Sequence, residues 1–308
     1  MEHLALGLVL LAGTLTASSP PRLQDLDPVK EVALDMAPTS FDDQYRGCSR
    51  MMEEELEELN RTEFANNSVY AEAWTHAAAE WRSRQGHVPR LLGLRPERAV
   101  ALLAYTLHGP LYLAFNTAVR EAGRSRGEYL GAFRFKALHF LLTEALRALR
   151  DTQPRRCHRV YRGVRGIRFT ARPRQSVRFG QFTSTSLRNE STLPFGQDTF
   201  FSVETCYGVP IKDFSFFPTE EEVLIPPFES FEVTDVARDG DRALIQLRSQ
   251  DALSTYNCEL VTAKHGTARH STARHGMARR GTVQHSMAKH GMALHGTARH
   301  GTVQHSMA

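Results

Sequence analysis

Residues 218–227 read Pro-Thr-Glu-Glu-Glu-Val-Leu-Ile-Pro-Pro, a run of acids that leads directly into an apolar segment. We predict a strand over 222–225, and side chains two residues apart on a strand share a face. Glu220 and Glu222 are therefore expected on one face, with Cα atoms about 6–7 Å apart. Neighbouring carboxylates can divide between acid–base work and stabilisation of a cation, although a glutamate run alone is more typical of a solvated loop.

Similar short segments, rich in Val, Phe, Thr and Ile and separated by turns, surround this strand between residues 155 and 260. Asp239-Gly240, between the last two segments, is a hairpin signal. No glycine-rich Rossmann or P-loop motif accompanies the segments, so those nucleotide-binding folds are not expected. The predicted strands cover 158–164, 176–187, 199–206, 222–225, 230–236 and 243–247.

Residues 48–150 have the pattern of helices instead. Trp74 and Trp81 share one helix face in an Ala-rich segment, and Pro96 occupies a position where helices begin. A helical half followed by a β half predicts an α+β fold, in which the N-terminal helical region packs on the sheets. The last helix has an apolar stripe formed by Leu138, Leu142, Ala145, Leu146 and Leu149.

The N-terminal end has the features of a secretory signal peptide, because an apolar run at 4–15 is followed by small residues. We place this peptide at 1–19 and an N-terminal extension at 20–47. No later stretch reaches about 18 consecutive apolar residues, so no transmembrane helix is expected. The C-terminus lacks the apolar tail of about 10–20 residues that a GPI signal requires. We therefore expect a secreted, extracellular protein.

Residues 264–308 form a repeat of period five that contains eight of the fourteen histidines. This period matches neither a helix nor a strand, so we expect a disordered tail after a folded body at 48–263. The tail carries seven Lys and Arg and no acid, and it accounts for the formal net charge of +4. The rest has 31 basic and 34 acidic residues, so no nucleic-acid partner is expected for it.

The four cysteines contain no CxxC pair, so no metal site is expected from them. An even number in a secreted chain indicates disulfides, and four cysteines can pair in three ways among which the sequence alone does not choose. The cysteines are Cys48, Cys157, Cys206 and Cys258. The N-x-[ST] sequons, which are candidate glycosylation sites, are at Asn60, Asn66 and Asn189.

Two features of the β half complement the glutamates. Arg162 precedes Gly163 in a predicted strand; a guanidinium fork matches a diphosphate, and glycine lets a ligand approach the backbone. In Phe-Thr-Ser-Thr-Ser, residues 182–186, the hydroxyl groups of Ser184 and Ser186 point to one face and can orient a carboxylate. Each feature alone is more typical of an ordinary polar strand, and only the combination is specific.

In this order, the arginine, the Ser-Thr-Ser strand and Glu-x-Glu resemble the signature of arginine-specific mono-ADP-ribosyltransferases. The resemblance to the vertebrate ecto-ADP-ribosyltransferase family covers residues 40–260, and without an anchor signal the chain is most similar to the secreted members. Further stretches that carry the resemblance are YLAFNTAVR (112–120), RFGQFTSTS (178–186) and EEEVLIPPFE (220–229).

The resemblance implies an enzyme that transfers ADP-ribose from NAD or NADP to an arginine-containing protein or a small guanidino acceptor and releases nicotinamide, without a metal. Arg162 would hold the diphosphate, and the backbone of Gly163 would bind the nicotinamide amide. Ser184 would bind the nicotinamide ribose and orient Glu222, which would hold the ribose 2′-hydroxyl and stabilise the ribosyl cation. Glu220 would bind the acceptor guanidinium and help to deprotonate it.

The resemblance also implies the ADP-ribosyltransferase fold, a mixed β-sandwich with the NAD cleft between its sheets, in a monomer with disulfides Cys48–Cys258 and Cys157–Cys206. Phe195 would stack on the nicotinamide. A glycan on Asn189 would crowd the mouth of the cleft. Two alternatives are a chain that mainly hydrolyses NAD and a non-catalytic secreted protein whose histidine-rich tail binds metals or polyanions.

Overall fold

The structure is a computed structural model that describes residues 28–84, 94–154 and 156–264. The chain divides into two units, Met1–Val261 and Thr262–Ala308, and the fold below is that of the first. Two expectations lie outside the described residues, namely the signal peptide at 1–19 and the disordered state of the repeat after residue 264.

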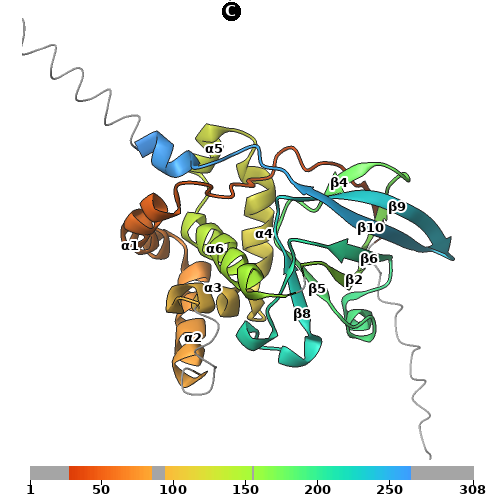
Figure 1. Ribbon diagram of the computed structural model, residues 1–308, viewed down its shortest axis with the longest axis horizontal. Coiled ribbons are helices and arrows are strands. Elements are labelled where there is room, and N and C mark those ends of the chain that lie inside the picture. The colour runs from red at the N-terminus through yellow and green to blue at the C-terminus, as the bar shows by residue number, and fades with distance from the viewer. Residues whose placement is uncertain (1–27, 85–93, 155, 265–308) are drawn as a thin grey trace, which may run out of the picture. The chain divides into compact units, whose positions relative to one another are not determined.

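The N-terminal half is helical, as its pattern predicts, and its helices lie together beside the strands (Figure 1). α3 and α4 both begin with proline, whose missing N–H needs no partner in the first turn. In α6 every residue from 136 to 146 is buried, so this helix forms the centre of the helical core. None of the described helices is long and apolar enough to cross a membrane. The helices are α1 (Ser49–Asn66), α2 (Ser68–Arg84), α3 (Pro96–Thr106), α4 (Pro110–Ala122), α5 (Arg126–Gly131) and α6 (Lys136–Thr152).

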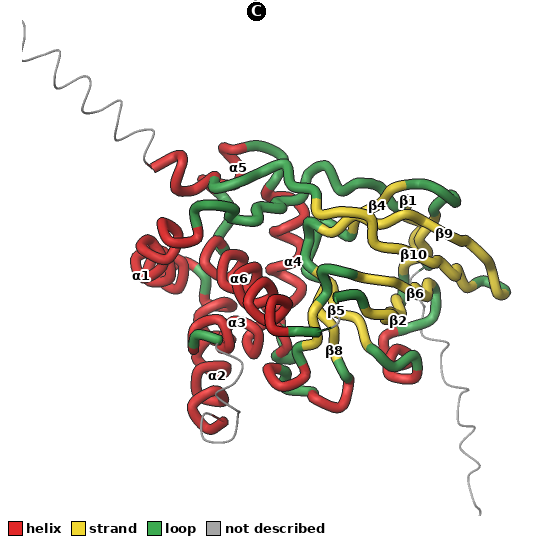
Figure 2. Tube along the Cα trace, viewed as in Figure 1, coloured by secondary structure: helices red, strands yellow, loops and turns green. Residues whose placement is uncertain are grey.

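The strands gather beside this helical core (Figure 2). The larger sheet has the order β4-β9-β10-β6-β2-β5-β8-β7, and a smaller sheet pairs β1 with β3 in parallel. β2 and β8 have the predicted bounds, and β9 and β10 form the hairpin expected around Gly240. The strands are β1 (Lys30–Ala33), β2 (His158–Val164), β3 (Ile167–Thr170), β4 (Ser176–Arg178), β5 (Thr183–Ser186), β6 (Thr199–Thr205), β7 (Val209–Pro210), β8 (Glu222–Ile225), β9 (Glu229–Asp239) and β10 (Arg242–Ala252).

The single strand expected over 176–187 is wrong, because the segment forms two strands, β4 and β5. Gly180 lies between them with a φ of +65°, which glycine adopts readily. A Cβ at this position would lie 2.3 Å from the Cβ of Ala37, so the N-terminal segment passes directly against the glycine. The turn separates the partners of the two strands, since β4 pairs with β9 and β5 pairs with β8.

The larger sheet divides where β2 meets β5, because these two strands share only the pair Tyr161–Ser186. Apolar side chains from both sides of this division meet in one core, among them Val160 of β2 and Val223 of β8. This core between strands is that of the expected mixed β-sandwich. Leu224 points the other way and packs in the helical core. β8 therefore lies between two apolar cores.

The segment before α1, which the expected domain boundary at 48 placed in an extension, is buried in the folded body. Phe41 is 0% exposed. Asp42 accepts a hydrogen bond from the backbone N–H of Thr255 at 2.8 Å and forms an ion pair with Arg178 at 2.6 Å. The side chains of this ion pair are 0% and 5% exposed, so the two charges neutralise each other away from water. Residues near both ends of the first unit are thus fastened to each other.

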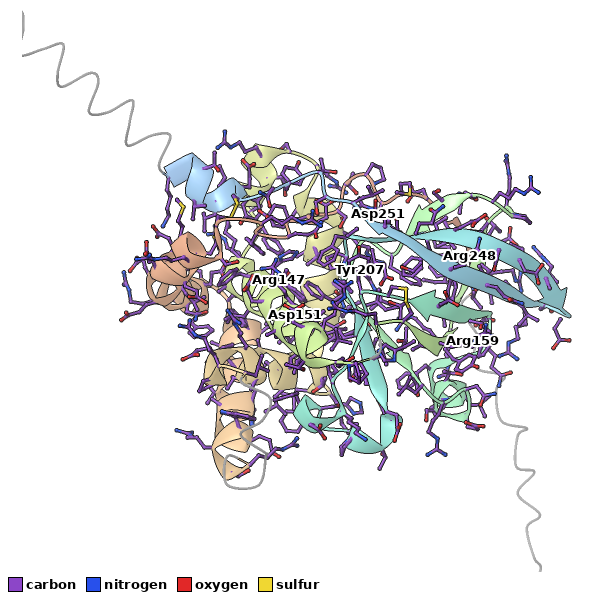
Figure 3. The ribbon with its side chains drawn as sticks, in the orientation of Figure 1. Arg147, Asp151, Arg159, Tyr207, Arg248 and Asp251 are labelled. Atoms are coloured by element: carbon purple, nitrogen blue, oxygen red, sulfur yellow. A yellow bond between two sulfur atoms is a disulfide. The ribbon has the colours of Figure 1, made fainter. Side chains whose placement is uncertain are left out.

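Two disulfides join segments that are far apart in the sequence, and their sulfur atoms are drawn in yellow in Figure 3. Cys48–Cys258 joins the start of α1 to the C-terminal segment, beside the contacts of Asp42. Cys157–Cys206 joins the start of β2 to the end of β6. These are the pairings that the family resemblance implied, among the three that the sequence left open.

Replacement of Asp42 by asparagine is expected to lower the free energy of unfolding by about 3–5 kcal/mol, because the Arg178 guanidinium would stay buried without a counter-charge. Urea unfolding followed by fluorescence measures this change. The matched control is Glu121→Gln, which removes an exposed ion pair with Arg124 and should change stability little. Equally small effects of the two substitutions would contradict this account of the buried pair.

Candidate active site

A pocket lies where the two parts of the sheet meet, between β2, β5 and β8. Two 3-10 turns complete its wall: η2 (Glu190–Phe195), which follows β5, and η4 (Pro218–Glu220), which precedes β8. In the part of the chain that the structure describes, no three His, Cys, Asp or Glu side chains are grouped to hold a metal ion. The six candidate residues that line the pocket are Arg162, Gly163, Ser184, Phe195, Glu220 and Glu222.

Glu222, the first residue of β8, is 6% exposed. Burial raises the pKa of its carboxyl group to about 7, because the charged form loses its hydration. Hydrogen bonds from Ser184 and Ser215 act in the opposite direction, and so does the positive charge of Arg162. The hydroxyl oxygen of Ser215 lies 3.5 Å from Glu222 Oε2. The carboxyl group therefore changes its protonation near neutral pH.

Glu220 lies at the end of η4 and not on β8, so the expectation that both glutamates share one strand face is wrong. Glu221 has a left-handed backbone, with φ 49° and ψ 49°, which turns the chain between them. The hydroxyl group of Ser186 donates to the Glu220 carbonyl oxygen at 2.6 Å and holds this turn against β5. Glu220 is only partly buried, so the pocket has one buried and one accessible carboxyl group.

Arg162 extends from β2 across the edge of β5. Its Nη1 donates to the carbonyl oxygen of Ser184 at 2.7 Å, and its Nη2 donates to the hydroxyl group of Tyr112, on α4, at 3.3 Å. These contacts hold the guanidinium in the wall of the pocket, while the side chain stays partly exposed. A guanidinium has five N–H donors, so this arrangement leaves donors for an anion in the pocket.

Turn η2 lies so close to β2 that only glycine fits at position 163. A Cβ on Gly163 would lie 2.4 Å from the carbonyl oxygen of Gly196 and 2.6 Å from that of Thr192. Phe195, the last residue of the turn, keeps 51% of its surface exposed. The turn therefore brings an accessible aromatic ring to the pocket, beside the backbone of β2.

Three further residues hold the parts of the pocket in place and were not predicted from the sequence, namely Tyr105, Tyr112 and Ser215. The hydroxyl group of Tyr105 donates to the Phe182 carbonyl oxygen at 2.8 Å, just before β5. Ser215 receives a hydrogen bond on its carbonyl oxygen from Arg84, at the end of α2 (2.9 Å). No local pattern links residues so distant in the sequence. Tyr112 lies within a stretch that carries the family resemblance, and this is the one signal that could have found it.

The three sequons occupy different settings. Asn60 lies in α1, where its side-chain oxygen accepts a hydrogen bond from Tyr70 at 3.2 Å. Asn66 is the exposed last residue of the same helix. Asn189 is exposed immediately before η2, so a glycan on it would stand beside the turn that carries Phe195.

The chain is similar to one family of known proteins. A family model described as NAD:arginine ADP-ribosyltransferase matches residues 34–255. An erythroblast NAD(P)(+)–arginine ADP-ribosyltransferase of Gallus gallus is 58% identical over 262 residues, which cover 85% of this chain and 87% of the relative. The GPI-linked NAD(P)(+)–arginine ADP-ribosyltransferase 1 of Homo sapiens is 50% identical over 278 residues, covering 86% and 85%. Ecto-ADP-ribosyltransferase 5 of Bos taurus is 41% identical over 239 residues, covering 75% of each chain.

A solved structure has the same fold. The crystal structure of the eukaryotic mono-ADP-ribosyltransferase ART2.2 superimposes with a TM-score of 0.64 at 40% identity, covering 74% of this chain and 98% of that one. A variant of the same protein, crystallised in complex with NAD, superimposes equally well, with a TM-score of 0.64. The likeness therefore extends over nearly the whole of a protein that binds NAD.

Glu222→Gln is expected to stabilise the fold above neutral pH. The pKa of Glu222 is raised from 4.5 to about 7, so the folded wild type binds a proton that the unfolded chain has lost, and its stability falls as pH rises through this window. The variant avoids this loss and should gain about 1–3 kcal/mol relative to wild type at pH 8, with little gain at pH 5. Urea unfolding at both pH values measures the difference.

The matched control for this measurement is Glu204→Gln, which changes an exposed glutamate on β6. Its stability relative to wild type should be the same at pH 5 and pH 8. A stability gain for Glu222→Gln that does not grow with pH would show that the buried carboxyl group carries no such penalty.

Proposed function

The chain belongs to the NAD:arginine ADP-ribosyltransferase family, and on that premise we propose that it transfers one ADP-ribose from NAD to an arginine side chain and releases nicotinamide. We propose NAD hydrolysis at the same site as a side activity, and no metal requirement. The observation that carries the proposal is the presence of two unlike carboxyl groups in one pocket, Glu222 buried and Glu220 partly exposed.

We assign NAD binding to the residues around the buried carboxyl group. Arg162 has guanidinium donors left for the diphosphate, and Gly163 presents a backbone without a side chain to the nicotinamide amide. Ser184 binds the nicotinamide ribose and orients Glu222, a role supported by its hydrogen bond to that carboxyl group. Phe195 offers an exposed ring on which the nicotinamide can stack.

In the chemical step, the bond between ribose C1′ and the nicotinamide nitrogen breaks. The electron pair of that bond leaves with nicotinamide, and positive charge develops on the ribosyl carbon. The ionised carboxylate of Glu222 stabilises this charge and holds the 2′-hydroxyl group. The pKa of Glu222 is about 7, and the positive charges of Arg162 and of the bound nicotinamide ring favour its ionised form.

Glu220 receives the acceptor. A guanidinium ion is a poor nucleophile, because it is almost always protonated and has no free electron pair. The carboxylate of Glu220 orients the ion and takes its proton as the new bond from nitrogen to C1′ forms. Water that attacks the same carbon, with loss of a proton, gives hydrolysis instead. The partial exposure of Glu220 is what lets a side chain of another protein reach it.

Glutamine substitutions at Glu222 and Glu220 are expected to affect nicotinamide release and ADP-ribose transfer differently. Glu222→Gln should lower both nicotinamide release and ADP-ribose transfer about 100- to 1,000-fold, because the ribosyl cation loses its counter-charge. Glu220→Gln should lower transfer at least about 100-fold but nicotinamide release in the absence of an acceptor much less. Labelled NAD, incubated with and without the guanidino compound agmatine, measures both products.

Glu221→Gln is the matched control, because Glu221 stands between the two glutamates but does not line the pocket. Its activities should equal those of wild type. Substantial NAD cleavage by Glu222→Gln would exclude the proposed mechanism, and unchanged arginine modification by Glu220→Gln would remove Glu220 from acceptor binding.

We also propose that the protein folds in the secretory pathway and acts outside the cell as a monomer. Its two disulfides support this route, because such bonds persist in oxidising compartments, and so does the apolar run at 4–15. Asn60, Asn66 and Asn189 are then available for glycosylation. The proposed catalytic domain ends near residue 263, so the repeat should not be needed for turnover.

Expression of the full chain in vertebrate cells should place the active enzyme in the culture medium, because no anchor is proposed. Immunoblotting of medium and washed cells measures the partition. Treatment of the cells with a phospholipase that cleaves phosphatidylinositol anchors is the control. Release of most of the enzyme by this treatment would show an anchored protein and contradict secretion.

A further inference from the structure

His108 lies near Glu220 through its contact with Phe217, although it is remote in sequence. It lies in the short connection between α3 and α4, and its ring stacks on that of Phe217 with centroids 3.9 Å apart and an interplanar angle of 23°. Phe217 is the residue that immediately precedes η4, the turn that ends at Glu220. The stacked rings therefore stand next to the accessible carboxyl group of the pocket.

Backbone contacts hold the rings and Glu220 together. The hydroxyl group of Thr106, at the end of α3, accepts a hydrogen bond from the backbone N–H of Phe216 at 3.2 Å. The backbone N–H of Glu220 in turn donates to the carbonyl oxygen of Phe217 at 3.1 Å. The first bond ties the end of α3 to the segment before Glu220, and the second holds Glu220 to Phe217, the residue on which His108 stacks.

The Glu220 carboxyl group is available to bind a cation. No described residue donates a hydrogen bond to it or forms an ion pair with it, and it is partly open to solvent. Partial burial raises its pKa, and the nearby His108 acts in the opposite direction. His108 itself is exposed, so the part of its ring that Phe217 does not cover is accessible.

A guanidinium ion is flat and binds differently through its edge and its face. The edge donates hydrogen bonds to a carboxylate, and the face stacks on an aromatic ring. Glu220 offers the first kind of contact and His108 the second, with Phe217 behind it. Both groups are open to solvent, so an arginine side chain can approach them from outside.

We propose that His108, supported by Phe217, is an acceptor-binding residue that forms one wall of the arginine site together with Glu220. This inference rests on the proposed transferase function and deepens it. It assigns His108 to recognition of the acceptor and not to binding or cleavage of NAD. The class of ligand is a guanidinium, in a protein or in a small molecule.

The experiment measures transfer to agmatine as a function of agmatine concentration at saturating NAD, and nicotinamide release without acceptor. His108→Ala should raise the KM for agmatine about two- to fivefold, because an exposed stacking contact with a cation is lost. Nicotinamide release without acceptor should stay close to the wild-type rate. His108→Phe restores a flat ring and should return the KM to near the wild-type value. His76→Ala, which removes another exposed histidine on α2, should change neither quantity.

The outcomes separate the inference from the function on which it rests. An unchanged KM for agmatine in His108→Ala would overturn the assignment, and so would an equal loss of nicotinamide release, which would indicate a role in NAD cleavage or in folding. Failure of His108→Phe to restore the KM would exclude stacking as the cause. A wild-type enzyme that releases nicotinamide but never modifies agmatine would overturn the proposed transferase function, and the acceptor site with it.

Discussion

The loss of hydration at the Glu222 carboxyl group is the constraint around which the pocket is arranged. Glu222 begins β8, the strand whose next two residues pack in the two apolar cores, so its carboxyl group lies where water is largely excluded. A charge in such a place is costly unless polar groups surround it. Ser184, Ser215 and Arg162 supply those groups, and each is brought there by a different part of the chain. The fold thereby keeps a carboxylate close to its point of ionisation, where a developing positive charge has the largest effect on it.

The accessible half of the pocket is built from a turn and from surface connections, and not from a strand. Glu220 is in a turn and not in a strand, and the groups next to it, His108 and Phe217, come from connections at the surface. Such a site can accept a side chain of a large partner without opening the buried half. The division between the buried and the accessible half of the pocket thus corresponds to the division between the strand β8 and the turn η4 that leads into it.

Local sequence patterns predicted the strands that carry the site better than the turns beside it. The predicted strands at 158–164 and 222–225 coincide with β2 and β8, because β-branched and aromatic residues between turn signals are typical of buried strands. The predicted strand at 176–187 failed at Gly180, where the chain turns with a positive φ and passes against a distant N-terminal segment. The placement of Glu220 failed because nothing in the pattern signals the left-handed backbone of Glu221. Ser215 and His108 were not predicted because their contacts, with Arg84 and with Phe217, join parts of the chain that no local period relates.

The Cys48–Cys258 disulfide has a mechanical consequence. The bond spans a sequence separation of 210 residues, and the strands and turns that carry the pocket lie entirely within the loop that it closes. Tension applied between residues 48 and 258 is carried by the sulfur–sulfur bond, without stretching the chain between them. A pull that acts between residues 48 and 258 therefore leaves the strands and turns of the pocket without load.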